Sequence, residues 1–295
     1  MEQQNKKAML GIIVPMLIFG TIGILREYSG LPSGLLSMSR GLIGAAFLFM
    51  VMLVSRAKIN REGVKKNFLL LFVSGAMIGV NWILLFEAFK LTTVPIATLS
   101  YYMAPVFVIL AATVVFKEKL TKQKALCTLV AFIGITLVTF GSDNGGADAK
   151  NHLLGILFGV GAAALYAGDI LINKTIDGVN PQERTLIQLV TAGAVCIPYT
   201  LLVEDLEKVE FTATSITLLV IMGVVHTGIA YTMYFGSIKQ LPAQTVALLS
   251  YIDPVSSVIL AVILIPSSNL TPWGWIGALL VLGSTVVSEL PSKNK

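Results

Sequence analysis

The amino-acid sequence has little charge, cysteine or histidine, and each shortage excludes a class of protein. Asp, Glu, Lys and Arg make up 13% of its 295 residues and hydrophobic residues 55%, whereas about a quarter of a soluble domain is charged. Most of the chain must therefore face something other than water. The two cysteines, Cys127 and Cys196, lie inside apolar runs, which predicts packed free thiols and no disulfide.

Motifs for catalysis and for ATP-driven pumping are also missing. The sequence has no Gly-x-x-x-x-Gly-Lys-Ser/Thr phosphate loop, no nucleophile motif and no His, Cys and Asp cluster at metal-ligand spacing. We therefore expect no enzymatic activity, no cofactor and no metal. A nucleic-acid partner is not expected either, because the basic residues behind the net charge of +5 lie in loops between apolar runs.

Apolar runs of about 20 residues recur along the chain, and this length crosses the hydrocarbon core of a bilayer. Inside a bilayer, a single segment satisfies its own backbone hydrogen bonds only as a helix. We therefore predict an all-α integral membrane protein with ten transmembrane helices. They cover residues 8–25, 33–54, 68–87, 93–116, 123–140, 152–173, 184–203, 213–236, 242–265 and 272–289.

Loop charges predict the orientation of these helices. Basic residues gather at Lys6 and Lys7, in the 56–66 loop and over residues 117–124, all on one side of the predicted membrane. Because cytoplasmic loops carry an excess of Lys and Arg, both termini are predicted to be cytoplasmic. The segment 141–151, which is rich in Gly, Asp and Asn, is then an external loop.

The two halves of the chain repeat each other. Leu-Ser-Tyr at 99–101 recurs at 249–251, and Pro105 recurs as Pro254. Because each half has five predicted spans, the second copy enters the membrane from the opposite side, and the repeats are inverted. The predicted divisions are a first repeat at 1–141, an external linker at 142–151 and a second repeat at 152–295.

Pro105 and Pro254 interrupt the fourth and ninth predicted spans. Proline cannot donate to the carbonyl four residues back, which leaves the carbonyls of Tyr101 and Ser250 free. Matched broken helices in the two halves of a transporter point to its binding site. We predict that the two prolines are hinges and that a substrate binds beside them.

With these features the chain resembles the ten-span members of the drug/metabolite transporter superfamily, which have two EamA-type domains. The resemblance is carried by the segment 95–105, by Phe-Lys-Glu-Lys-Leu-Thr at 116–121, by Leu-Thr at 270–271 and by Arg40. It implies inverted repeats, alternating access and a central cavity lined by the first four helices of each half, with the fifth helices peripheral. It also implies transport of small metabolites, often amino-acid export, in a bacterial cytoplasmic membrane.

Ionisable residues inside the predicted spans are candidates for substrate or proton binding, because a charge at the bilayer centre costs about 2.5–3.5 kcal/mol on insertion scales. Asp253 lies deep in its span and is predicted to bind substrate; a structural acid paired with Arg40 is the other interpretation. Arg40, Asp169 and His226 are candidate charge or proton sites. The structural alternatives are an interhelical brace, an interfacial acid and a hydrogen-bonded packing residue, respectively.

Aromatic and polar residues within the spans complete the predicted substrate site. A hydroxyl facing hydrocarbon near mid-span would be unsatisfied, so several of these side chains should point inward. Interfacial aromatic belts are the structural alternative for Trp82, Tyr231 and Tyr234. With Asp253, the predicted substrate-binding residues are Asn81, Trp82, Tyr101, Tyr166, Tyr231, Tyr234, Ser250 and Tyr251.

The predicted function is a secondary transporter, working as an exporter, of a small polar metabolite such as an amino acid. The alternative is a carrier of a cationic amine or quaternary ammonium compound such as choline, since inward tyrosines can form a cation–π cage with Asp253 as counter-charge. A membrane enzyme or a receptor without flux is a third class. Besides the small-molecule substrate, the lipid bilayer is the expected partner, and small residues at Gly75 and Gly79 allow a homodimer.

The orientation is testable with single cysteines in a cysteine-free background. We expect Asn144→Cys to react with a membrane-impermeant thiol reagent added to intact cells and Lys58→Cys to be protected, because the two loops are predicted on opposite sides. Permeabilised cells, in which both positions react, are the control. Labelling of position 58 alone in intact cells would overturn the orientation.

Overall fold

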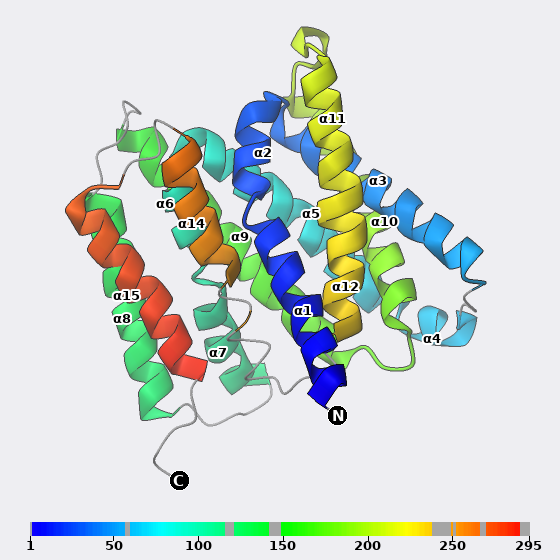
Figure 1. Ribbon diagram of the computed structural model, residues 1–295, viewed down its shortest axis with the longest axis horizontal. Helices are drawn as coiled ribbons and strands as arrows, with labels where there is room; N and C mark the ends of the chain where they lie inside the picture. The colour runs from blue at the N-terminus through cyan, green and yellow to red at the C-terminus, as the bar shows by residue number, and fades with distance from the viewer. Residues whose placement is uncertain are drawn as a thin grey trace.

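The computed structural model describes residues 2–56, 60–115, 121–141, 149–237, 249, 252–265 and 270–289. Over these ranges the protein is helical and has no β-strand (Figure 1), so the predicted all-α class is confirmed for them. The elements are α1 (Glu2–Phe19), α2 (Ile22–Ser29), α3 (Ser33–Val54), α4 (Arg61–Lys66), α5 (Phe68–Leu91), α6 (Val94–Tyr101), α7 (Ala104–Val115), α8 (Lys122–Gly141), α9 (Ala149–Thr175), α10 (Pro181–Val203), η1 (Leu206–Lys208), α11 (Ala213–Ile221), η2 (Met222–Ile229), α12 (Ala230–Ser237), α14 (Ile252–Leu264) and α15 (Pro272–Glu289).

Six spans within the described residues are long and apolar enough to cross a membrane. They are Lys6–Ser29, Ser33–Val54, Phe68–Leu91, Asn151–Asn173, Pro181–Val203 and Ala213–Tyr234. Shorter apolar helices occupy Val94–Val108, Ala125–Gly134, Val255–Leu264 and Pro272–Ser284. Each shorter helix falls inside one of the four remaining predicted spans. That all ten spans cross the membrane stays a prediction.

The residues at the N-terminal ends of α10, α11 and α15 suit a helix start. They either accept a hydrogen bond from a free backbone N–H of the first turn or are proline, which has no N–H to satisfy. Pro181 opens α10 and Pro272 opens α15, because proline at the first position of a helix loses no hydrogen bond. At the start of α11, the side chains of Thr212 and Ser215 each accept from the other's backbone N–H and form a capping box. Such local signals explain why the observed helix starts lie close to those predicted from the sequence.

Three predicted spans are not continuous α-helices. The first is broken at Gly20–Thr21, between α1 and α2, where the sequence pattern predicted a continuous helix because no proline marks the break. The fourth is broken at Tyr102–Met103, just before Pro105. The eighth contains η2, a π-helix of 8 residues, and π-helical turns are rare and frequent at functional sites.

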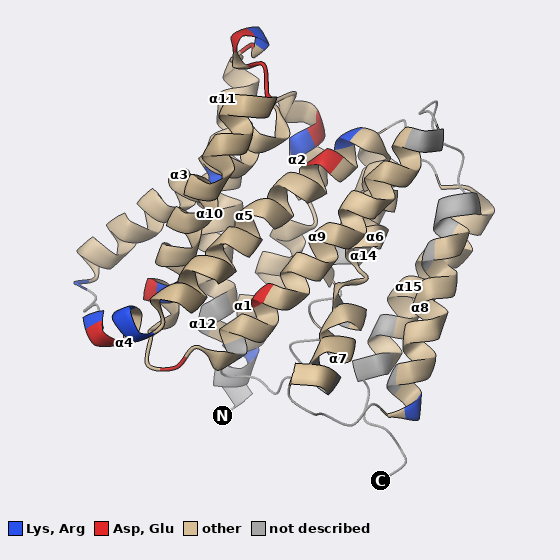
Figure 2. Cartoon of the chain, turned by 180° about the vertical axis from the view of Figure 1, so that it is seen from behind, with Lys and Arg blue, Asp and Glu red and all other residues tan. Residues whose placement is uncertain are grey.

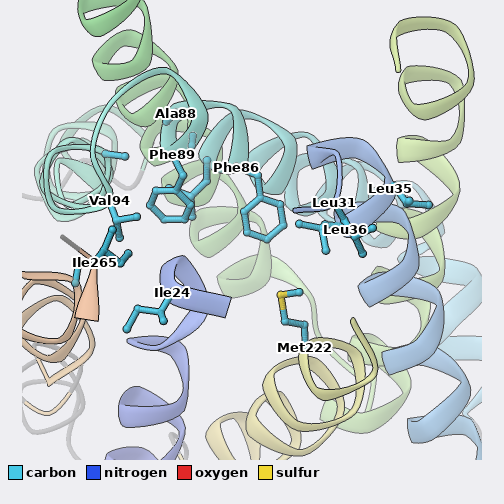
Figure 3. Packing of buried hydrophobic residues seen from close by; sticks show 14 residues of the cluster. Ile24, Leu31, Leu35, Leu36, Phe86, Ala88, Phe89, Val94, Met222 and Ile265 are labelled. Carbon is cyan, nitrogen blue, oxygen red and sulfur yellow. The ribbon is translucent and has the colours of Figure 1, made fainter. Parts of the chain in front are cut away.

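The bundle is built largely from pairs of helices that come from opposite halves of the chain. α5 packs along α9, α3 along α10 and α8 along α15, and the α8–α15 pair lies at one edge of the molecule (Figures 1 and 2). A buried cluster joins Ile24 of α2, Leu36 of α3, Phe86 of α5 and Met222 of η2 (Figure 3). These contacts hold the second part of the broken first span against three other spans.

Charged residues lie mainly at the two ends of the bundle, and long stretches between the ends carry none (Figure 2). The N-terminus and α4 lie toward one end, and the turn before α11 lies at the other (Figure 1). An apolar zone between two charged ends is the arrangement that a bilayer requires.

The α3–α10 contact is close enough to require glycine. A Cβ atom added at Gly41 would lie 2.9 Å from the backbone nitrogen of Gly193 and 3.2 Å from the carbonyl oxygen of Leu189. Both atoms belong to the backbone of α10, so no side chain can move aside to make room. The two helices must separate if position 41 carries any side chain.

We expect Gly41→Ala to lower the free energy of unfolding by about 1–3 kcal/mol, seen as a lower melting temperature of the protein in detergent. Gly161→Ala is the matched control, because the added methyl group meets only the end of the Leu84 side chain, at 3.5 Å. An unchanged melting temperature for the G41A variant would show that the two helices are not in such close contact.

Candidate functional site

The irregular segments of the first, fourth and eighth spans meet one another and the start of α14 in one region. The break in the first span packs on α14, because a Cβ atom on Gly20 would lie 3.0 Å from the carbonyl oxygen of Asp253. The Oγ1 atom of Thr21 in the same break is 2.8 Å from Nε2 of His226 in the π-helix η2. The break in the fourth span places Tyr102 in a side-chain hydrogen bond with Asp253. Irregular backbone at membrane depth occurs only inside protein or beside water, which makes this region the candidate site.

Arg40 of α3 places a buried guanidinium group beside η2. The residue is 5% exposed; its Nε atom donates to the Thr227 hydroxyl at 3.1 Å, and its Cζ atom lies 4.1 Å from the centroid of the Trp82 ring. Among the described residues, no carboxylate lies within ion-pair distance of Arg40, so the Arg40–Asp253 pair considered from the sequence is not formed. The described groups that contact the guanidinium are neutral, and no acid in the described part of the chain compensates its charge.

One group of aromatic rings surrounds Arg40. Tyr231 packs edge to face on Trp82, with 6.5 Å between the ring centroids, and edge to face on Phe19 at 5.4 Å. Phe86 lies 5.7 Å from the Arg40 Cζ atom on another side. Trp82 is buried and contacts a guanidinium within the bundle, which is not the environment of a residue in an interfacial belt.

A second aromatic group extends from the break in the fourth span. Tyr101 contacts Tyr102 at 5.9 Å and Tyr166 of α9 at 5.7 Å between ring centroids. Tyr234 of α12 lies near enough to Tyr166 to interact with it electrostatically. All four side chains are half-buried. The structure thus brings together tyrosines from α6, α9 and α12 beside Asp253.

Asn81 lies beside the second aromatic group, because its side chain forms a hydrogen bond with Tyr101. Its amide also donates to the carbonyl oxygen of Ala162 at 2.5 Å, which links α5 to α9. Other predicted residues lie elsewhere or cannot be placed. Asp169 belongs to a separate polar cluster. Ser250 and Tyr251, together with the side chains of Pro105 and Pro254, fall outside the described residues. The backbone of Pro254 lies in the first turn of α14.

The separate polar cluster joins α5, α9 and α10. The Ser74 hydroxyl donates to the Asp169 carboxylate and accepts from the Gln188 amide. Asn173 also donates to the Asp169 carboxylate, at 2.8 Å, and Arg184 donates to the Asn173 carbonyl oxygen at 3.3 Å. Asp169 is therefore a buried acceptor that ties three helices together at one end of the bundle.

Sequence reasoning missed Thr21, Ser74 and Gln188. Each is a single polar residue inside an apolar run, and a lone Ser, Thr or Gln in a span has many structural uses. For Thr21 the available signal was the pair Gly20-Thr21, since small residues next to each other are common at helix kinks. For Ser74 and Gln188 the partners come from distant helices, and the sequence carries no sign of them.

Comparison with known proteins identifies the family. The sequence model of the EamA-like transporter family matches residues 6–140 and matches again over residues 153–289. The chain belongs to the EamA-like transporter family. It is therefore a multi-pass membrane transporter with one family domain in each half.

Two bacterial proteins and one solved structure resemble this EamA-family transporter over most of its length. The chain is 28% identical over 261 residues to the uncharacterized transporter YxxF of Bacillus subtilis (strain 168). The matched region covers 88% of this chain and 82% of the relative. The chain is 27% identical over 226 residues to protein RarD of Salmonella typhi, covering 74% and 72%. A crystal structure of a protein with 20% sequence identity matches over 96% of both chains with a TM-score of 0.69, which shows a shared fold.

The transporter has a cavity of about 690 Å³ near the C-terminal ends of α2, α5 and α10. Glu204, which follows α10 and lines this cavity, caps α3 from a distance: its carboxylate accepts from the backbone N–H of Gly34 at 2.6 Å and of Leu35 at 2.9 Å. Pro32, which precedes α3, supplies no side-chain cap. Burial raises the pKa of Glu204, because the loss of hydration outweighs the two N–H bonds.

This cap predicts a pH-dependent stability. The folded transporter holds the pKa of Glu204 above its ordinary value of 4.5, so it binds this proton more tightly than the unfolded chain does. The resulting stabilisation is complete below pH 4.5 and is lost as the pH rises through the folded-state pKa. We therefore compare the wild type with Glu204→Gln. The difference in melting temperature (wild type minus variant) should decrease as the pH is raised from about 4 to about 7.

Glu207→Gln, in the exposed η1, is the matched control for this prediction and should track the wild type across the same pH range. If the melting temperature of the wild type instead rises relative to that of E204Q as the pH increases, the stated direction of the pKa shift is wrong.

Proposed function

We propose that this EamA-family protein is a secondary transporter that exports a small carboxylate-bearing metabolite, such as an amino acid, across a bacterial cytoplasmic membrane by alternating access. The observation that carries the proposal is the buried Arg40 guanidinium, which has no carboxylate partner in the described part of the chain. Export and the bacterial cytoplasmic membrane follow the family resemblance, and the relatives YxxF and RarD are bacterial proteins.

A guanidinium group is suited to a carboxylate because its paired N–H groups match both oxygens. Stacking on Trp82 fixes the plane of the Arg40 side chain, and the Nε bond to Thr227 fixes its rotation. No described residue bonds to the two Nη groups, which leaves that edge for a ligand. An uncompensated charge inside a span is costly and marks a functional site, and a bound anion removes that cost.

Asp253 supplies the opposite charge for an amino group on the same metabolite. It lies in α14, in the second half of the chain, whereas Arg40 lies in α3, in the first half. The tyrosines between them, with Trp82, offer aromatic faces and hydroxyls to the remainder of the molecule. A metabolite that bridges the two charges therefore contacts both halves at once.

The pattern of helix pairing supports ten spans in two inverted repeats at 1–141 and 152–295, with the linker 142–151 outside and both termini inside. The third span of the first half packs on the first span of the second half (α5 on α9). The third span of the second half packs on the first span of the first half (η2 and α12 on α1). A two-fold relation between the halves produces this reciprocal pairing, and rocking one half against the other gives alternating access. Pro105 and Pro254 then act as the hinges.

A carrier of a quaternary ammonium compound such as choline is the second candidate. The observation that favours it is the group of Tyr101, Tyr102 and Tyr166 beside Asp253, because tyrosine faces and a carboxylate together attract a cation. This candidate gives Arg40 no ligand, which is why we prefer a metabolite with a carboxylate.

A thermal-shift screen of the purified protein with amino acids, other small carboxylates and choline-type amines tests the proposal. We expect carboxylate-bearing compounds to raise the melting temperature of the wild type, and Arg40→Gln to weaken their binding about 30-fold, since a hydrogen bond to a charged group contributes about 2 kcal/mol. Counterflow in proteoliposomes loaded with the stabilising compound then measures transport.

Asp253→Asn separates the two candidates, because it keeps the size and hydrogen-bonding capacity of the side chain and removes the charge. We expect it to insert normally and to lose most amino-acid transport, yet to bind carboxylates that lack an amino group. Stabilisation by choline that persists in R40Q and disappears in D253N would favour the second candidate. A screen in which no carboxylate and no amine stabilises the wild type would contradict both.

A further inference from the structure

The ring of His226 contacts the break in the first span through one nitrogen and a carbonyl of its own span through the other. Its Nε2 atom is 2.8 Å from the Thr21 hydroxyl, and its Nδ1 atom is 3.4 Å from the carbonyl oxygen of Ile221. The Thr21 hydroxyl is also 2.8 Å from the carbonyl oxygen of Ile18. His226 is 2% exposed, so these three contacts account for the surroundings of the ring nitrogens.

All three contacts are hydrogen bonds only when the ring carries two protons. Carbonyl oxygens accept and never donate, so Nδ1 needs a proton to bond to Ile221, and the Thr21 hydroxyl spends its single proton on Ile18. Nε2 must then donate to Thr21. Neutral imidazole carries one proton and leaves one contact unmade, whereas imidazolium makes all three. The local geometry therefore favours the charged ring.

Arg40 opposes that charge. Its Nε atom bonds to Thr227, the neighbour of His226, and its guanidinium group interacts electrostatically with the ring. Two positive charges close together in a poorly hydrated region disfavour each other. An anion bound to Arg40 compensates the first charge and so permits the second.

The described residues of the other elements packed on η2 bring no further charge to the ring. α11 and α12 contain no Asp, Glu, Lys or Arg, and their titratable groups Tyr231 and Tyr234 are neutral phenols near Trp82 and Tyr166. In α2, Arg26 and Glu27 pair with each other at 3.7 Å. In α1, Lys6 and Lys7 are exposed. Among the described charged groups, Arg40 is thus the one that acts on the ring of His226.

We propose that His226 binds a proton when an anion occupies Arg40, so that the transporter carries one proton together with each carboxylate. The inference rests on the proposed function, because the anion is the carboxylate of the substrate. By linkage, a proton on His226 tightens anion binding by the same factor. The proton then crosses together with the substrate, and an outward gradient of metabolite takes protons out with it.

Proton binding also acts on the fold. The imidazolium ring donates to Thr21 and so joins the break between α1 and α2 to the π-helix η2. The first and eighth spans are thereby held together when the site is loaded, and the contact is weaker when it is empty. A loaded site and an empty site thus differ in how firmly two spans from opposite halves are connected.

Solution or solid-state NMR of protein labelled with ¹⁵N-histidine tests the coupling without a known ligand. The chain has 2 histidines, and His152→Asn assigns their signals. Arg40→Gln removes the charge that a bound anion would compensate, and Arg40→Lys keeps it. At any one pH between about 5 and 7, we expect the ratio of imidazolium to neutral His226 to be about tenfold higher in R40Q than in the wild type, and within about twofold of the wild type in R40K.

Equal ratios in the wild type and a folded R40Q variant would overturn the proposal. If R40Q does not give a monodisperse helical protein, Thr21→Val and Thr21→Ser take its place. Valine removes the acceptor for Nε2 and should lower the imidazolium ratio about tenfold, while serine should preserve it; no change in T21V also overturns the proposal. These outcomes are distinct from failure of the proposed function, which the thermal-shift screen detects as the absence of stabilising carboxylates.

Discussion

Every backbone N–H and C=O group at membrane depth must find a partner within the protein, and this requirement shapes the whole chain. Continuous helices meet it without help. Where the first and eighth spans depart from the α-helix, threonine hydroxyls take over: Thr21 donates to the carbonyl of Ile18 at 2.8 Å, and Thr227 to that of Met222 at 2.9 Å. The same two hydroxyls contact His226 and Arg40. The hydroxyl groups that bond to these backbone carbonyls thus also position the ionisable side chains.

Charge in this protein is divided between its halves. Arg40 and Asp253 both have neutral partners, Thr227 with Trp82 for the cation and Tyr102 for the acid, and they do not form an ion pair with each other. A direct pair would satisfy both groups and leave neither for a ligand. In the proposed function, the substrate completes this pairing when it binds and ends it when it leaves.

The positions of the helices could be predicted from the sequence because hydrophobic length and flanking charge are local properties. The break at Tyr102 was predictable within a few residues from Pro105, whereas the break at Gly20–Thr21 and the π-helix were not, since neither has a proline. Several aromatic residues of the candidate site could be named from the sequence because tyrosine and tryptophan inside a span are conspicuous, whereas Tyr102 and the phenylalanines near Arg40 were not among them. The grouping of these rings around Arg40 was not predictable, because it depends on how α3, α5 and η2 pack.

The α8–α15 pair stands apart from this arrangement. α15 packs along α8, and α8 contacts the rest of the bundle through α6 and α7, at the edge of the molecule (Figure 1). The last helix of each half is thus anchored to its counterpart rather than to the residues around Arg40. In the proposed alternating access, this pair is the stationary element: the remaining helices tilt while their chain ends stay attached to it.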